Sequence, residues 1–233
     1  MKNTIILPTY NERENIVSLV KEIFLLLPDI DIMVVDDNSP DGTAAEVERL
    51  MIQYANLSIL KRPIKDGLGR AYIDGFKKLL VSEDIENVIT MDSDFSHNPK
   101  YLPIMLEEAK SHDLVVGSRY IKGGGITNWE LWRRFLSKGG NFYVGMLLGK
   151  KINDWSSGFN CIRISALRKI NLDKIEFYGY AFLSCLKYFL VKAGAQAKEI
   201  PIIFEERRKG KSKMSGSIIR EGLIAPWKIL FTK

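Results

Sequence analysis

The sequence predicts an α/β fold with a mostly parallel central sheet and helices on both of its faces. In the first half of the chain, short apolar runs alternate with segments of helical periodicity, and each apolar run ends in polar or turn-forming residues. Strands that alternate with helices favour parallel pairing, because each helix carries the chain back across one face of the sheet. With 46% apolar and 27% charged residues over 233 positions, the composition is that of a globular protein with a sizeable core.

Five strands are expected in the first half, at 4–7, 30–35, 57–60, 88–91 and 113–119. The connecting helices are expected from Ile16 to Phe24, over 43–54, over 71–80 and from about Pro99. A basic, glycine-bearing loop at 61–69 and the turn residues at 36–42 separate some of these elements. Each of these strands therefore ends in a segment that can carry functional side chains.

The second half departs from this alternation. The sequence there predicts a glycine-rich loop at 122–126, a helix from Trp129 to Leu148, a polar turn at 154–159 and an extended segment at 160–164. A helix at 182–193, an edge strand at 198–205 and a basic segment at 207–213 follow. Because no internal repeat or linker interrupts the chain, we expect a single domain over 1–233, with successive regions at 1–120, 121–217 and 218–233.

The net charge of +6 and the pI near 9.1 make the chain moderately basic. Nucleic acid, an anionic membrane surface and phosphorylated substrates would all suit that charge. Cys161 and Cys185 show neither metal-ligand spacing nor a disulfide framework, which predicts reduced core thiols in the cytoplasm. No secretory signal opens the chain, and no stretch reaches the roughly 18 apolar residues that a membrane span needs.

Two carboxylates, Asp92 and Asp94, follow the apolar run from Val88 to Met91. Residues i and i+2 of an extended segment project to the same side, and open α/β sheets bind ligands at the carboxyl ends of their strands. Two converging carboxylates repel each other unless a cation lies between them, and Mg²⁺ or Mn²⁺ with phosphate oxygens would fit. The alternative is a pair of solvated loop acids.

Six motifs occur in a fixed order. They are Pro-Thr-Tyr-Asn-Glu (8–12), Val-Asp-Asp-Asn-Ser-Pro-Asp-Gly-Thr (35–43), Met-Asp-Ser-Asp-Phe-Ser-His (91–97), Gly-Ser-Arg-Tyr (117–120), Ser-Gly-Phe (157–159) and Arg-x-x-Gly-x-Ser-Lys (207–213). The set resembles the dolichol-phosphate mannose synthases, which are inverting family-two nucleotide-sugar glycosyltransferases with a GT-A fold. The likeness runs from Ile5 to about Ser217.

The resemblance implies three groups of site residues. The donor site would consist of Pro8, Tyr10, Glu12, Val35, Asp37, Asp92, Ser93, Asp94 and Lys213, with the metal on Asp92 and Asp94. The acceptor phosphate would be bound by Arg119, Arg133, Ser137 and Arg207, and the catalytic groups would be Asp92, Asp94, Arg119 and Arg207. Arg133 and Ser137 are four residues apart on an expected helix and therefore share a face.

Three further residues have expected roles near this site. Some relatives have glutamine where this chain has Ser96, so a metal role there would be weak or would act through water. His97 is interpreted as a structural loop residue, and Asp154 as a group that orients the acceptor or the sugar.

The implied reaction is metal-dependent transfer of mannose from GDP-mannose to dolichyl or polyprenyl phosphate, with inversion. Residues 1–120 would then bind donor and metal, 121–217 the acceptor, and 218–233 would be an interfacial tail. UDP-glucose as donor is the main alternative. A non-catalytic basic module that binds nucleotides or nucleic acid through 207–213 is a distant one, because it leaves the paired acids without a role. A dehalogenase-type phosphatase is disfavoured, since its acids usually follow the first strand.

A polyprenyl phosphate lies in a bilayer, so the enzyme has to dock there. We expect peripheral contact with the cytoplasmic face of a membrane, no nucleic-acid partner, and a possible separate membrane subunit. Aromatic and apolar residues are mixed with Arg133 and Arg134 from Trp129 to Phe135, and the segment from Ile218 to Phe231 has a similar character. Core packing with solvated charges is the competing interpretation of both segments.

Overall fold

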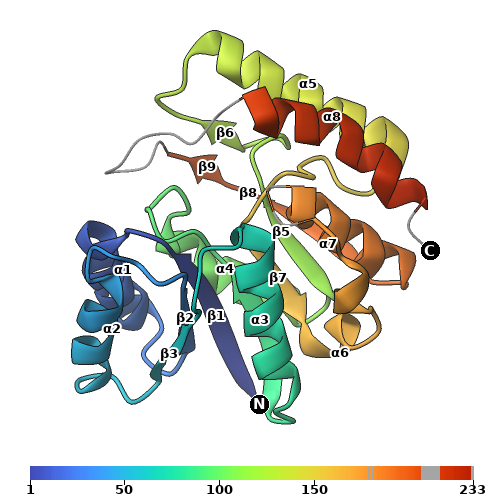
Figure 1. Ribbon diagram of the computed structural model, residues 1–233. Helices are drawn as coiled ribbons and strands as arrows, with labels where there is room; N and C mark the ends of the chain where they lie inside the picture. Colours follow the sequence, from blue (N-terminus) through green and yellow to red (C-terminus); the bar gives the residue numbers. More distant parts are fainter. Residues whose placement is uncertain (178, 180, 206–215, 232–233) are drawn as a thin grey trace.

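The computed structural model describes residues 1–177, 179, 181–205 and 216–231 (Figure 1). Of the expected site residues, Arg207 and Lys213 lie outside the described residues, as does the basic segment around them. The other expected donor, metal and acceptor residues are all described.

A seven-stranded sheet forms the centre of the fold, in the order β3-β2-β1-β4-β7-β5-β8. Its strands are β1 (Lys2–Thr9), β2 (Asp31–Asp36), β3 (Leu57–Lys61), β4 (Ile85–Thr90), β5 (Leu114–Ser118), β7 (Asn160–Arg163) and β8 (Ala197–Pro201). All neighbouring pairs are parallel except those of β7, which runs antiparallel to both β4 and β5. The expected mostly parallel α/β sheet is confirmed.

Helices cover both faces of this sheet, as expected from the alternation of strands and helices. The helices of the described chain are α1 (Arg13–Leu26), α2 (Thr43–Met51), α3 (Leu68–Leu80), α4 (Leu102–Ala109), α5 (Leu131–Leu148), α6 (Ile164–Leu167), α7 (Ala181–Lys192) and α8 (Gly216–Phe231), and of these α5 lies beyond the end of the sheet and not on a face (Figure 1). Short 3₁₀ turns, η1 (Pro99–Tyr101) and η2 (Leu172–Lys174), precede α4 and follow α6.

The alternation of side chains along each strand divides the core in two. Ile5 and Leu7 of β1 pack with α1, α2 and α4 on one face, whereas Ile6 packs with α3, α6, α7 and α8 on the other. Since successive residues of a strand point to opposite faces, one strand contributes to both clusters. The buried face of α8 includes Ala225 and Ile229, so part of the C-terminal helix belongs to this core.

The expected edge strand at 198–205 is divided in the structure. β8 ends at Pro201, and the short β9 (Ile203–Phe204) pairs instead with β6 (Gly125–Ile126) in a separate two-stranded sheet. Proline has no N–H group to donate to a neighbouring strand, which is consistent with the end of β8 there. β9 brings Phe204 next to the carboxyl end of the central sheet.

Helices α5 and α8 lie side by side above the carboxyl ends of the parallel strands (Figure 1). The Tyr143 hydroxyl donates to the Leu223 carbonyl at 3.0 Å, and the Trp227 indole N–H donates to the Tyr143 oxygen at 2.7 Å. Among the described residues, no helix is both long enough and apolar enough to cross a membrane. Cys161 and Cys185 are both buried free thiols, and burial raises the pKa of each to about 12.

Candidate active site

The carboxyl ends of β1, β2 and β4 meet at one edge of the sheet, and each is followed by a residue with a left-handed backbone. These residues are Asn11, Asn38 and Phe95, with φ values of 60°, 55° and 66°. Non-glycine residues adopt this conformation at an energetic cost, and such residues concentrate at functional sites. The strained backbone of these three turns therefore marks this edge of the sheet as a candidate functional site.

The loop after β4 presents the two carboxylates that the sequence singled out. The Ser96 amide donates to Asp94 Oδ1 at 3.0 Å, and the Ser93 hydroxyl donates to the Pro8 carbonyl at 2.9 Å. Asp94 is buried, whereas the Asp92 side chain is 30% exposed. Asp92 and Asp94 line the same pocket, so the structure brings them together as expected.

His97 fixes the other end of this loop. Its Nδ1 accepts the Asp92 amide N–H at 3.0 Å, and its ring stacks on Phe159 with centroids 5.0 Å apart. Burial is the main reason that the pKa of His97 falls to about 4. The imidazole is therefore neutral at physiological pH and acts as an acceptor for the backbone of Asp92. This geometry agrees with the interpretation of His97 as a structural loop residue.

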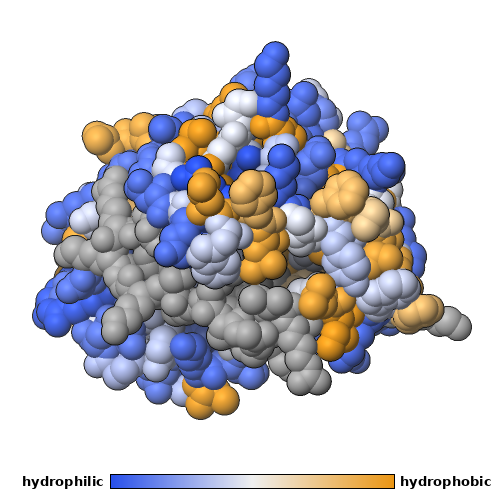
Figure 2. All heavy atoms as spheres, turned by 90° about the horizontal axis from the view of Figure 1, so that it is seen from above, coloured by the Kyte–Doolittle hydropathy of each residue, from blue (hydrophilic) through white to orange (hydrophobic). Residues whose placement is uncertain are grey.

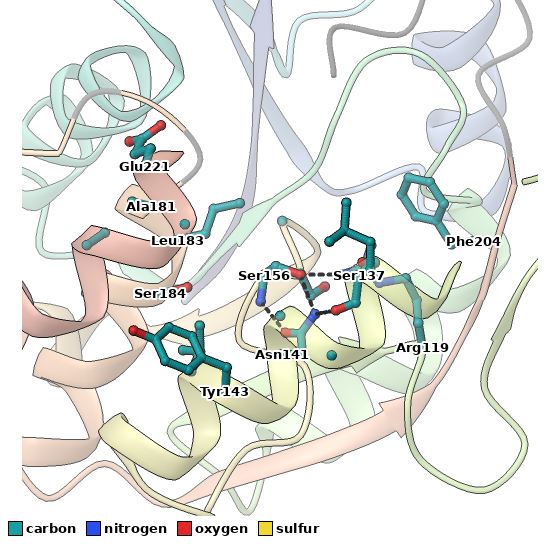
Figure 3. A pocket seen from close by; sticks show the side chains of 18 of the residues that line it. Arg119, Ser137, Asn141, Tyr143, Ser156, Ala181, Leu183, Ser184, Phe204 and Glu221 are labelled. Atoms are coloured by element: carbon teal, nitrogen blue, oxygen red, sulfur yellow. Dashed lines mark hydrogen bonds between the residues drawn. The ribbon is translucent and has the colours of Figure 1, made fainter. Parts of the chain in front are cut away.

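A pocket of about 660 Å³ extends from Asp92 and Asp94 to the space between α5 and α8. Figure 3 shows part of its lining, with Arg119, Ser137, Asn141 and Ser156 close together. Its polar end also contains Ser96, His97, Arg119, Arg133, Ser137, Asn141 and Ser156. Its other end is lined mainly by apolar residues, among them Leu136, Val144, Ala225, Pro226 and Ile229. The cavity thus joins a pair of acids to an apolar chamber under the α8 helix.

Arg119 reaches the pocket, but its charge is already compensated. Its Nε and one terminal nitrogen each donate to the carboxylate of Asp154 at 2.7 Å, and the Arg119 amide donates to the same carboxylate at 3.0 Å. Asp154 is completely buried and Arg119 is 8% exposed. Burial alone would raise the pKa of Asp154, but the adjoining Arg119 guanidinium lowers it below its usual value. Asp154 therefore orients Arg119 and does not itself face the pocket.

Arg133 and Ser137 face the same pocket from α5, as their four-residue spacing predicts. The Arg133 guanidinium lies over the Trp129 ring, 3.8 Å from its centroid. The Ser137 hydroxyl accepts a hydrogen bond of 2.7 Å from the Tyr120 hydroxyl. A cation and a hydroxyl on one helix face, opposite two acids, form an arrangement that can bind a phosphate group.

The expected nucleotide residues lie beside this pocket, at the ends of β1 and β2, and do not line it. The Lys65 ammonium lies 3.7 Å from the centroid of the Tyr10 ring, and Asn15 donates to the Glu12 carboxylate at 2.8 Å. Asp37 pairs with the buried Arg62, although burial outweighs this pairing and raises the pKa of Asp37. Val35 is fully buried in the core, so only its backbone is placed to meet a base.

The oxygen ligands offered by Asp92 and Asp94 fit a hard divalent cation that completes its coordination with substrate oxygens. Among the described residues, no group of three or more His, Cys, Asp or Glu side chains is arranged to hold a metal by itself. Asp92 and Asp94 provide two carboxylates, which matches how proteins bind Mg²⁺ together with phosphates and water. Ser96 adds a buried hydroxyl that has no hydrogen-bond partner in the described structure, which suits an additional water-mediated contact.

Tyr120, Asn141 and Ser156 are pocket or network residues for which the sequence suggested no role, although Tyr120 lies in the Gly-Ser-Arg-Tyr motif and Ser156 in the polar turn at 154–159. Asn141 lies four residues after Ser137 and eight after Arg133, so the helical spacing that linked Arg133 to Ser137 also pointed to it. Ser156 comes from a separate polar turn, and nothing in the sequence pattern connected it to α5.

Comparison with known proteins agrees with this architecture. Residues 4–174 match the sequence model of glycosyl transferase family 2. The chain is 38% identical over 224 residues to the undecaprenyl-phosphate mannosyltransferase of Micrococcus luteus, covering 96% of this chain and 92% of that protein. It is 40% identical to the polyprenol monophosphomannose synthase of Mycolicibacterium smegmatis, covering 98% and 87% of the two chains.

A solved structure supports the fold. Glucosyl-3-phosphoglycerate synthase from Mycobacterium tuberculosis, in complex with Mn²⁺ and UDP-glucose, superposes with a TM-score of 0.70 and 16% identity, covering 98% of this chain and 78% of that one. At this identity the likeness concerns the fold, and it confirms the expected GT-A architecture. Together with the match to the family model over most of its length, this places the chain in glycosyl transferase family 2, and the protein is a glycosyltransferase.

Proposed function

We propose that this glycosyltransferase transfers a mannosyl group from GDP-mannose to a polyprenyl phosphate, with inversion at the anomeric carbon. The observation that carries the proposal is the continuous pocket that joins Asp92 and Asp94 to an apolar chamber. A lipid phosphate needs both ends of such a cavity, one for its anionic head and one for its first isoprene units. The names of the two bacterial relatives, a mannosyltransferase and a mannose synthase that use polyprenyl phosphates, support the same substrate class.

The donor would lie across the carboxyl ends of β1, β2 and β4. Tyr10 offers a ring face to the base, and Glu12 and Asp37 offer acceptors for ribose hydroxyls. Ser93, which stands between the two acids in the sequence, links their loop to β1 through its bond to the Pro8 carbonyl. Asp92 and Asp94 would hold Mg²⁺ or Mn²⁺ on the diphosphate. When bound, such a cation neutralises the charge of the leaving group. The presence of Mn²⁺ together with UDP-glucose in the solved structure of similar fold is consistent with a divalent cation here.

The acceptor phosphate would be held by Arg133 and Ser137 of α5, with Arg119 beside them. A phosphate monoester has a second pKa of about 6, so it is largely a dianion near neutral pH and needs no strong general base. Its oxygen forms the bond to the anomeric carbon while the bond from that carbon to the diphosphate breaks, and the electron pair leaves with the nucleoside diphosphate. Alignment and electrostatic stabilisation supply the catalysis.

The surface of α5 and α8 fits a membrane interface. Large hydrophobic side chains are exposed along both helices, namely Leu131, Trp132, Phe135, Phe142, Met146, Leu223, Trp227 and Phe231. Figure 2 looks onto this side of the molecule and shows hydrophobic side chains among hydrophilic ones. Isolated apolar side chains are common on surfaces, but so many on two adjacent helices indicate a contact site. The chamber lies beneath these helices, so docking there would bring it to the lipid.

A donor screen tests the proposal. The purified protein is incubated with polyprenyl phosphate, Mg²⁺ or Mn²⁺ and either GDP-mannose or UDP-glucose, and the lipid-linked sugar is measured after extraction into organic solvent. We expect mannose in the organic phase with GDP-mannose and no transfer when the cation is chelated. Glucose transfer alone would replace the donor assignment, and transfer from neither donor to the lipid would refute the proposed function.

A further inference from the structure

Helix α5, which carries Arg133 and Ser137, is only weakly embedded in the protein. Of its 18 residues, all of which the structure describes, only Asn141 and Leu148 are buried. Most of its apolar side chains are exposed or half-buried above the pocket. Packing against the core therefore does little to fix the rotation of this helix about its own axis, which determines where Arg133 and Ser137 point.

Asn141 supplies a polar connection in place of that packing. Its side-chain amide donates to the Ser156 hydroxyl at 2.9 Å, and its side-chain oxygen accepts the Ser156 backbone N–H at 3.0 Å. The same amide also donates to the Ser137 carbonyl at 2.9 Å, within α5. Asn141 is 5% exposed, and a buried amide with this many satisfied bonds defines one orientation of its helix.

Ser156 continues the connection into the buried ion pair. Its hydroxyl accepts a hydrogen bond of 2.6 Å from the Arg119 guanidinium and donates one of 3.3 Å to the Asp154 carboxylate. Figure 3 shows Asn141, Ser156 and Ser137 joined by these bonds beside Arg119. One chain of contacts therefore runs from the buried Arg119–Asp154 pair to the backbone of α5.

The spacing of residues along α5 links this connection to the direction in which Arg133 and Ser137 point. Arg133, Ser137 and Asn141 are each four residues apart, so they follow one another on a single face of the helix. A rotation of α5 that broke the Asn141–Ser156 pair would turn Arg133 and Ser137 away from Asp92 and Asp94 as well.

We propose that Asn141 is a positioning residue for the acceptor, which holds α5 on Ser156 so that Arg133 and Ser137 face the two acids. This rests on the proposed function, because it takes the ligand at Arg133 and Ser137 to be the phosphate of the acceptor. Asn141 acts through these two residues, and the donor side of the site does not depend on it.

The test is a steady-state comparison of Asn141→Ala with the wild-type protein in detergent, with polyprenyl phosphate and GDP-mannose varied separately. Loss of one or two net hydrogen bonds corresponds to an effect of roughly 5- to 30-fold. We expect a loss of that size in kcat/KM for the lipid, with the KM for GDP-mannose within about twofold of wild type. Lys138→Ala, an exposed position of the same helix outside the pocket, is the matched control and should leave both constants unchanged.

Ser156→Ala approaches the same connection from the other side and also serves if Asn141→Ala fails to fold. In a double-mutant cycle, the two substitutions should be partly non-additive for the lipid kcat/KM, because both remove the bond from the Asn141 amide to the Ser156 hydroxyl, whereas the bond from the Ser156 backbone N–H to Asn141 is lost only in Asn141→Ala. An unchanged lipid kcat/KM in the folded variants, or equal changes in both substrate constants with a fall in Tm, would overturn the positioning role. If instead the wild-type protein transfers no sugar to the lipid at all, the proposed function has failed and not this inference.

Discussion

The buried pair of Arg119 and Asp154 offers a sharp test, because its structural and catalytic roles can be separated. Asp154 is completely buried and accepts three hydrogen bonds from Arg119. Arg119→Met leaves the Asp154 carboxylate buried without its cation, and Asp154→Asn leaves the guanidinium without its anion. Removing one partner of a buried pair typically costs about 3–5 kcal/mol, since the remaining charge is uncompensated.

The double variant removes both charges. Methionine fills much of the volume of arginine, and the asparagine oxygen can still accept the backbone N–H of residue 119. Replacement of a buried pair by uncharged side chains is often close to neutral. If each single substitution costs about 4 kcal/mol, independent effects would sum to about 8 kcal/mol, whereas we expect the double variant to lose less than either single one.

Urea unfolding of the four proteins measures these free energies. Trp155, which follows Asp154 in the same turn, is fully buried and provides a fluorescence signal. A double variant that is less stable than both single variants would refute the account of Arg119 as a paired, structurally committed residue. The stable double variant then tests the acceptor role. We expect weaker use of the lipid phosphate, and an unchanged lipid KM would remove Arg119 from the acceptor site.

Three further predictions concern single positions. Asp94→Ala should abolish cation-dependent transfer, measured as lipid-linked sugar over a range of Mn²⁺ concentrations, and full activity would rule out the metal role. Arg133→Ala should raise the KM for polyprenyl phosphate by roughly tenfold and leave that for GDP-mannose unchanged, which initial rates with each substrate varied will decide. Burial lowers the pKa of Lys187 from its usual 10.5 to about 7. Between pH 7 and pH 10.5 the unfolded chain therefore binds more protons at this residue than the folded one, so the free energy of unfolding rises with pH over that range. The unfolding free energy of the wild type minus that of Lys187→Met should therefore increase by about 2 kcal/mol from pH 7 to pH 9, and a flat or falling difference would contradict the assignment.

The parallel half of the sheet was predictable because its strands are buried on both faces. The predicted runs 4–7, 30–35 and 88–91 are mainly apolar, and the structure places them in β1, β2 and β4, apart from Ile30, which precedes β2, and Met91, which follows β4. The same logic predicted that Asp92 and Asp94 would share a pocket, since the carboxyl end of β4 can present side chains only to one edge of the sheet.

The antiparallel course of β7 was not predictable from the sequence. The segment at 160–164 was recognised as extended, but the direction of this strand depends on where the preceding helix, α5, ends relative to the sheet. Because α5 lies above the carboxyl ends of the parallel strands, the chain re-enters the sheet from that side and must run back (Figure 1). Local patterns contain no information on that position.

The pairing of Arg119 with Asp154 was missed for a related reason. The two residues are 35 positions apart on different loops, and each is plausible as a pocket residue by itself. Only the completed fold shows that Asp154 is fully buried and that its carboxylate is already bound. For Val35 the sequence predicted a role that the fold restricts. The resemblance implied a nucleotide contact, but the complete burial of Val35 leaves only its backbone to make one.

The compensated state of Arg119 changes how the site attracts two anionic substrates. Among the described residues that line the pocket, Asp92, Asp94 and Glu221 are acidic, and the basic ones are Arg119 and Arg133. With Arg119 neutralised by Asp154, these side chains alone present an excess of negative charge, which disfavours both a diphosphate and a lipid phosphate. A divalent cation at Asp92 and Asp94 would neutralise the two carboxylates at that end, while Arg133 acts on the opposite side. The acceptor phosphate should therefore bind better once the cation is in place than before it.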